Sequence, residues 1–84
     1  GEYYGSATWD PGSVAAGATT QTTVAVTEAA VGDLAIASFS LPNASMLPHA
    51  QVTAAGVVTV TLTNISGAPI DLNSGTVRVR VFHN

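Results

Sequence analysis

Three segments alternate between apolar and polar residues with a period of two, and this pattern constrains the fold more than any other feature. They are TTQTTVAV (residues 19–26), VVTVTLT (57–63) and TVRVRVF (76–82). Successive side chains of a β-strand point to opposite faces, so each segment predicts a strand with two different faces. In the second segment Val58, Val60 and Leu62 are predicted to point inward. In the third, Val77, Val79 and Val81 are predicted to lie on one face, opposite Arg78 and Arg80.

Turn signals and short apolar runs predict the other strands. Residues 10–12 (DPG) have turn chemistry, so a first strand is expected to end near Trp9. Residues 28–33 (EAAVGD) are too few for an independent helix and predict a loop. Residues 34–40 (LAIASFS) are apolar on both sides, which predicts a strand covered on both faces. Ala55-Gly56 predicts a hairpin between its two flanking strands.

Two longer segments predict irregular structure. Residues 41–49 (LPNASMLPH) contain two prolines, which cannot donate to a strand ladder, so this segment is expected to be a loop or a crossing at a sheet edge. Residues 64–75 are rich in turn residues and predict a connection held to the core by three apolar side chains. These are Ile65, Ile70 and Leu72.

The fold class follows from six to seven short strands without a convincing helix. This pattern predicts an all-β fold, an antiparallel β-sandwich or jelly-roll-like barrel. Residues 9–84 are expected to form this single domain, and residues 1–8 an N-terminal arm, a linker or a cloning remnant.

Composition favours association with other chains. Only 8% of the 84 residues are charged, whereas soluble domains average about 25%. A domain of this size has a small core, and no cysteine is present to form a disulfide, so oligomerisation is the expected source of further stability. A formal net charge of −3 with two arginines and no lysine gives no basic surface for nucleic acid or an anionic membrane.

The sequence contains no motif that predicts catalysis. His49 and His83, 34 positions apart, are the only candidate bases near neutral pH, and neither belongs to a nucleophile motif. Asp10 and Asp33 are predicted to be turn and cap residues, and no calcium or phosphate loop occurs. We therefore expect no enzymatic activity, no cofactor and no metal site. Asn43 and Asn64 both match the N-glycosylation triplet.

The arginines allow two interpretations. On a solvated sheet face, Arg78 and Arg80 would act as gatekeepers against edge aggregation. At a subunit boundary, they would instead pair with a neighbour's carboxylates such as Asp33 or Asp71. Phe82 is predicted to share their face, and an aromatic side chain beside arginines is typical of an interface centre.

The aromatic residues near the start of the chain also allow two interpretations. Tyr3, Tyr4 and Trp9 would suit a platform on which sugar rings stack. Alternatively, Trp9 fills the core and the two tyrosines belong to the terminal segment.

Residues 9 to 82 resemble small domains of bacteriophage and prophage virion proteins. The resemblance is carried by the DPGSVAAG turn, the threonine-rich strand after it, the GD turn before an apolar strand, and the IDLNSGTVRVRV ending. It implies a head-decoration, head-fibre or tail-fibre module that is commonly trimeric and exposed on the particle.

The expectation from sequence is therefore a non-enzymatic structural domain at the virion surface, which assembles as a homotrimer beside other virion proteins. One alternative is a carbohydrate- or receptor-binding module for a host surface glycan. The other is a monomeric immunoglobulin-like spacer of a bacterial surface protein.

Overall fold

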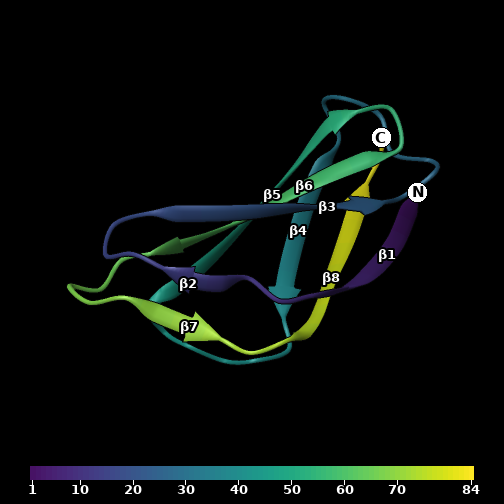
Figure 1. Cartoon of the computed structure of the whole chain (residues 1–84). Helices are drawn as coiled ribbons and strands as arrows, with labels where there is room; N and C mark the ends of the chain where they lie inside the picture. Colours follow the sequence, from purple (N-terminus) through teal and green to yellow (C-terminus); the bar gives the residue numbers. More distant parts are fainter.

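The computed structural model describes all 84 residues, which form eight β-strands and no helix (Figure 1). The predicted all-β sandwich is confirmed. The number of strands exceeds the predicted six to seven, because two strands of three residues are too short to show a periodic pattern. The strands are β1 (Glu2–Trp9), β2 (Gly12–Val14), β3 (Thr19–Ala25), β4 (Leu34–Phe39), β5 (Met46–Ala54), β6 (Val57–Asn64), β7 (Ile70–Leu72) and β8 (Gly75–Phe82).

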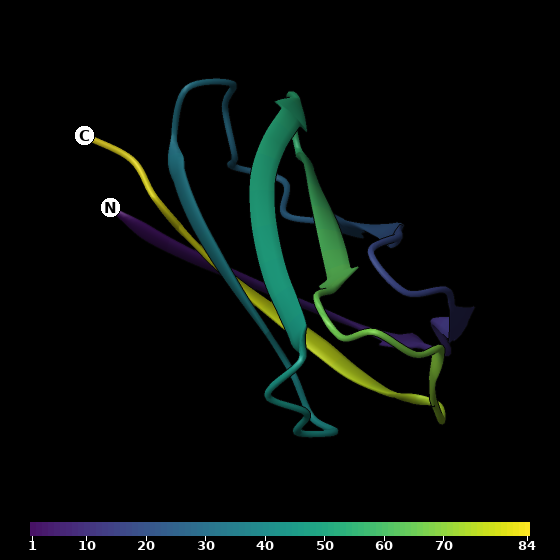
Figure 2. The ribbon, with the colours of Figure 1, turned by 90° about the vertical axis from the view of Figure 1, so that its left-hand side faces the viewer.

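Two antiparallel sheets of three strands form the layers of the sandwich. In one sheet β8 lies between β1 and β4, and in the other β6 lies between β3 and β5. The connections from β3 to β4 and from β4 to β5 carry the chain from one sheet to the other and back. As a result β4 packs beside β5, and β1 beside β3 (Figures 1 and 2).

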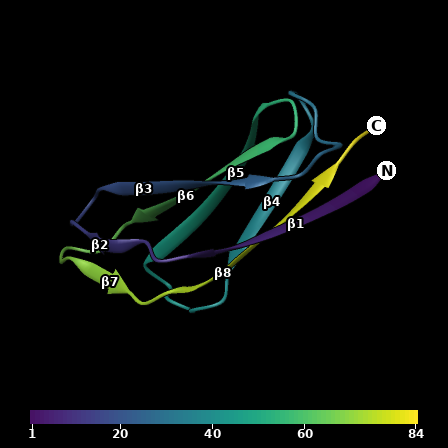
Figure 3. The ribbon, with the colours of Figure 1, turned by 45° about the vertical axis from the view of Figure 1, so that its right-hand side comes forward.

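The remaining two strands, β2 and β7, pair antiparallel as a short ribbon, which we call the β2–β7 ribbon. It lies at the opposite end of the molecule from the two chain termini (Figures 1 and 3). The molecule is elongated, with extents of 39 × 20 × 18 Å. The ribbon and the termini therefore mark its two ends.

The core lies between the two central strands, as the alternation predicted. The inward apolar side chains of β6 and β8 are all at most 4% exposed; they are Val58, Val60 and Leu62 from β6, and Val77, Val79 and Val81 from β8. Each such side chain contributes about 1.5–3 kcal/mol when it leaves water. Trp9 and Phe39 pack against both clusters of buried residues and so join the sandwich core to the cluster beneath the ribbon.

Residues 1–8 differ from the arm or linker that the sequence predicted. Residues 2–9 form β1, which pairs with β8 along its whole length from Glu2–Phe82 to Trp9–Gly75. The inward side chains of β1 include Gly5 and Ala7, which give a much weaker apolar pattern than the valines of β8. The predicted end of a first strand near Trp9 is confirmed, but this weak pattern did not show that the strand extends over residues 2–8.

Gly5 lies where β1 passes very close to the second sheet. A Cβ atom at this position would lie 2.7 Å from Val26 Cγ2 and 2.8 Å from the Ala25 carbonyl oxygen. We expect Gly5→Ala to lower the free energy of unfolding by about 1–3 kcal/mol, because β1 or β3 must shift to admit the methyl group. Urea unfolding measures this change. Ser6→Ala, on the exposed side of β1, is the control, with an expected change within about 0.5 kcal/mol; equal stability of Gly5→Ala would contradict the close approach.

The two segments predicted to be irregular contain more strand than expected. β5 begins at Met46, so only residues 40–45 form a loop, but Pro48 does lie in an edge strand, as proline requires. In the second segment Ile70 and Leu72 pack against the core. Ile65 is 59% exposed, so its predicted anchoring role was wrong. The hairpin at Ala55-Gly56 is confirmed.

Candidate functional site

The outer face of the β1–β8–β4 sheet brings together the two arginines and several large apolar side chains. We call this surface the arginine face; it consists of Glu2, Tyr4, Ser6, Leu34, Ile36, Ser38, Arg78, Arg80 and Phe82. The period of two places these residues on one side, opposite the buried valines of β8. Across the strands, Arg80 stands directly between Tyr4 and Ile36.

The arginine face exposes an unusual amount of apolar surface. Tyr4 is 61% exposed, Leu34 65% and Ile36 54%. The sequence predicted that β4 is covered on both faces, but within one chain only its inward side is covered, by packing of Ala35, Ala37 and Phe39. β4 thus directs its two bulky aliphatic side chains outward and its two alanines inward. Grouped apolar residues on a sheet face that is normally polar indicate an interaction surface.

The two arginines have different surroundings on this face. The Arg80 guanidinium carbon lies 4.7 Å from the centre of the Tyr4 ring, and Nη1 lies 3.7 Å from Glu2 Oε1. Both partners of this ion pair are about half exposed, so the pair contributes little to stability. Arg78, between Ser6 and Ser38, forms no ion pair within the chain. Its charge is therefore available to another molecule.

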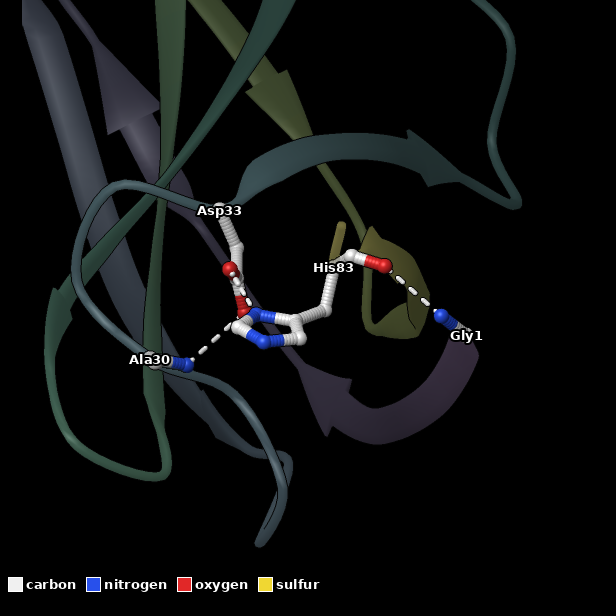
Figure 4. Close-up of polar contacts among 4 residues, drawn as sticks. All are labelled: Gly1, Ala30, Asp33 and His83. Carbon is white, nitrogen blue, oxygen red and sulfur yellow. Dashed lines mark hydrogen bonds and ion pairs between the residues drawn. The ribbon is translucent and has the colours of Figure 1, made fainter.

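Asp33, one of the two carboxylates predicted to meet a neighbour's arginines, has partners in its own chain (Figure 4). Oδ2 accepts a hydrogen bond of 2.9 Å from the Ala30 amide, and Oδ1 lies 2.5 Å from His83 Nδ1. The Gly1 ammonium donates to the His83 carbonyl at 2.6 Å, which joins the chain termini to this cluster. Asp33 and His83 also line a hollow with Leu34 and Phe82, at one end of the arginine face.

The hydrogen bond from Ala30, followed by that from His83, holds the pKa of Asp33 below its ordinary value of 3.8, although partial burial opposes this shift. The Asp33 carboxyl therefore binds its proton less tightly in the folded state than in the unfolded state. The stabilisation of the fold by the charged Asp33 side chain is complete above the ordinary pKa and is lost as the pH falls through the lower pKa of the folded state.

We expect the difference in free energy of unfolding between wild type and Asp33→Asn to shrink on acidification. Thermal unfolding of both chains from about pH 6 to about pH 2 measures it; a difference independent of pH would contradict this role.

Asp71, the other predicted interface carboxylate, lies on β7 opposite Ser13. It is exposed and forms no ion pair within the chain. Nearby, Asp10 Oδ1 accepts a hydrogen bond of 3.0 Å from the Gly12 amide, which confirms its predicted turn role. The pairing of the arginines with a neighbour's Asp33 or Asp71 stays a prediction.

The three aromatic residues of β1 do not share a surface. Tyr3 and Trp9 pack inward, and Trp9 meets Phe39 edge to face with ring centres 5.8 Å apart. Tyr4 points outward on the arginine face and lies beneath Arg80. Of the residues proposed as a sugar platform, only Tyr4 is therefore broadly accessible to a ligand.

Asn64 has a structural role that sequence analysis missed. Its fully buried side-chain amide donates to the Val14 carbonyl at 2.9 Å and the Ala68 carbonyl at 2.8 Å. Its Oδ1 accepts hydrogen bonds from both the amide and the hydroxyl of Ser66. The only sequence signal was a glycosylation triplet, which this burial makes inaccessible. Asn64 instead ties the end of β6 to the β2–β7 ribbon.

The remaining candidate groups do not form a site. His49 is exposed on β5 opposite Thr61, far along the chain from the His83 cluster. No three histidine, aspartate or glutamate side chains gather closely enough to hold a metal ion. The chain contains no helix that is long and apolar enough for a membrane span. Comparison with models of known protein families, and with the sequences of curated proteins, finds no match for this chain.

Proposed function

We propose that the chain is a non-enzymatic structural module that assembles with copies of itself through the arginine face, as a homotrimer at a virion surface. The observation that carries this proposal is the exposure of Tyr4, Leu34 and Ile36 on one sheet face. These are three of the six large apolar residues that the chain exposes, and they are grouped: Tyr4 and Ile36 flank Arg80, and Leu34 lies opposite Phe82.

The composition of the face suits a contact between proteins. Aromatic residues and arginine are enriched at interface centres, where their large side chains bury area while their polar groups set orientation. Covering this face would remove apolar surface from water at about 25 cal/mol per Å². The neighbour would then bury the outer face of β4, as expected for a strand whose sequence is apolar on both sides.

The virion setting is supported by the resemblance of residues 9 to 82 to phage virion domains. It implies a head-decoration, head-fibre or tail-fibre module with other virion proteins as partners. A nearly uncharged, threonine-rich surface with a net charge of −3 is consistent with a structural rather than a nucleic-acid-binding role.

The test is the solution mass, measured by light scattering at several chain concentrations. We expect a trimer for wild type and a shift toward monomer for Tyr4→Ser/Ile36→Ser, because the double change removes apolar area from the face. The matched control is Leu47→Ser/Ile65→Ser, which alters two other exposed apolar residues, 47% and 59% exposed, and should leave the trimer intact. A wild type that stays monomeric at high concentration would refute the proposal and return the arginines to a gatekeeper role.

A further inference from the structure

We propose that the arginine face of one chain binds the β2–β7 ribbon of a second copy, head to tail, with Arg78 paired to Asp71 of the neighbour. This inference rests on the proposed self-assembly and adds which surface of the neighbour is bound. It also pairs two charged groups, one on each surface, that have no ion-pair partner within the chain.

Charge opposes the simplest alternative, in which two arginine faces pack against each other. That arrangement would bring four guanidiniums together, two from each copy. The face carries a single carboxylate, Glu2, which already lies beside Arg80. Like charges brought together at an interface are costly. The face is therefore better suited to a different, negatively charged surface.

The distribution of carboxylates identifies that surface. Two of the five are engaged in their own chain, Glu2 with Arg80 and Asp33 with His83. The other three have no ion pair; they are Asp10, Glu28 and Asp71.

Two of these three belong to the ribbon region. Asp71 lies on β7, and Asp10 lies two residues before the start of β2. The only two arginines of the chain both lie on β8, so no cationic side chain offsets these charges within the ribbon. Asp71 makes no side-chain hydrogen bond, and both of its oxygens are free to accept from a guanidinium. Charge complementarity thus selects the ribbon as the partner of the arginine face.

The positions of the two surfaces permit a closed assembly. The arginine face belongs to the sheet that holds the termini, and the ribbon lies at the other end of the molecule (Figure 3). Each chain can therefore bind one neighbour through its face and another through its ribbon. A head-to-tail contact of this kind closes into a ring when the rotation between copies allows it, and a ring of three matches the proposed trimer.

Charge reversal tests the pairing. We compare wild type, Arg78→Glu, Asp71→Arg and the double variant Arg78→Glu/Asp71→Arg by light scattering over a range of concentrations at low salt. Each single variant is expected to raise the concentration needed for assembly by about tenfold or more, because it places like charges together. The double variant is expected to recover most of the loss, because it restores an opposite pair at every contact. The matched control is Glu28→Arg, which changes the net charge by the same amount as Asp71→Arg but lies outside the ribbon. It should assemble like wild type.

The outcomes separate this inference from the proposed function. Monomeric wild type refutes both. If Arg78→Glu weakens assembly and Asp71→Arg does not, the face still assembles but the ribbon is not its partner. If Glu28→Arg weakens assembly as much as Asp71→Arg, or the double variant recovers nothing, specific pairing is refuted. Arg78 and Asp71 are both exposed, and circular dichroism of each variant establishes that it is folded.

Discussion

Asn64→Asp is expected to lower the free energy of unfolding by about 2–5 kcal/mol, although the two side chains have almost the same shape. The carboxylate cannot donate, so the Val14 carbonyl would lose the Asn64 donor, and the Ala68 carbonyl would keep only the Ser66 hydroxyl as a side-chain donor. If the new side chain stays charged, it is buried without a cation; if it takes up a proton, it can satisfy only one of the two carbonyls. Urea unfolding at a fixed chain concentration measures the loss, since the proposed assembly would make stability depend on concentration.

Asn43→Asp provides the matched control. Asn43 and Asn64 both use Oδ1 to accept a hydrogen bond from the amide two residues later, at 2.9 Å in each case. An aspartate keeps this bond, and Asn43 is exposed, so we expect a change within about 0.5 kcal/mol. Equal losses in the two variants would mean that the donor role of Asn64 is unimportant.

The role of Asn64 also bears on the proposed head-to-tail assembly. Its bond to Val14 fastens β2, one of the two strands of the ribbon, to the end of β6. A ribbon released from this anchor would present Asp71 less rigidly to a neighbour. Variants at Asn64 that still fold should therefore assemble less well than wild type.

Strands with a strong alternating pattern were predictable from the sequence. β6 and β8 each carry three valine or leucine residues at successive inward positions, and this repeat alone identified both strands and their buried sides. The turn at Asp10 and the hairpin at Gly56 were predictable because the required chemistry is local. β2 and β7 were not, since three-residue strands exist only through pairing with each other.

The candidate site was predictable only in part, because it combines residues that are distant in sequence. The alternation placed Arg78, Arg80 and Phe82 on one face of one strand. The register that sets Tyr4 and Ile36 on either side of Arg80 depends on pairing between the two ends of the chain and a strand from its middle. The same holds for the contact of Asp33 with His83. Such contacts follow from tertiary packing, which no local pattern encodes.

Trp9→Ala is expected to lower the free energy of unfolding by about 3–5 kcal/mol. The ring packs against both clusters of buried residues and meets Phe39 edge to face, so its removal leaves a cavity where the two parts of the core join. Urea unfolding monitored by circular dichroism measures the loss. A variant as stable as wild type would mean that Trp9 does not fill the core.

Tyr4→Ala, on the same strand, is the control because Tyr4 is 61% exposed, and we expect its effect on chain stability to stay within about 0.5–1 kcal/mol.

This contrast between Trp9 and Tyr4 decides how the carbohydrate-binding alternative must be tested. Loss of glycan binding in Trp9→Ala would report unfolding as readily as loss of a contact. Tyr4→Ala keeps the core intact and removes the one broadly exposed ring of β1. Glycan binding that disappears in a folded Tyr4→Ala chain would favour the binding module, whereas loss of assembly without any glycan binding would favour the structural module.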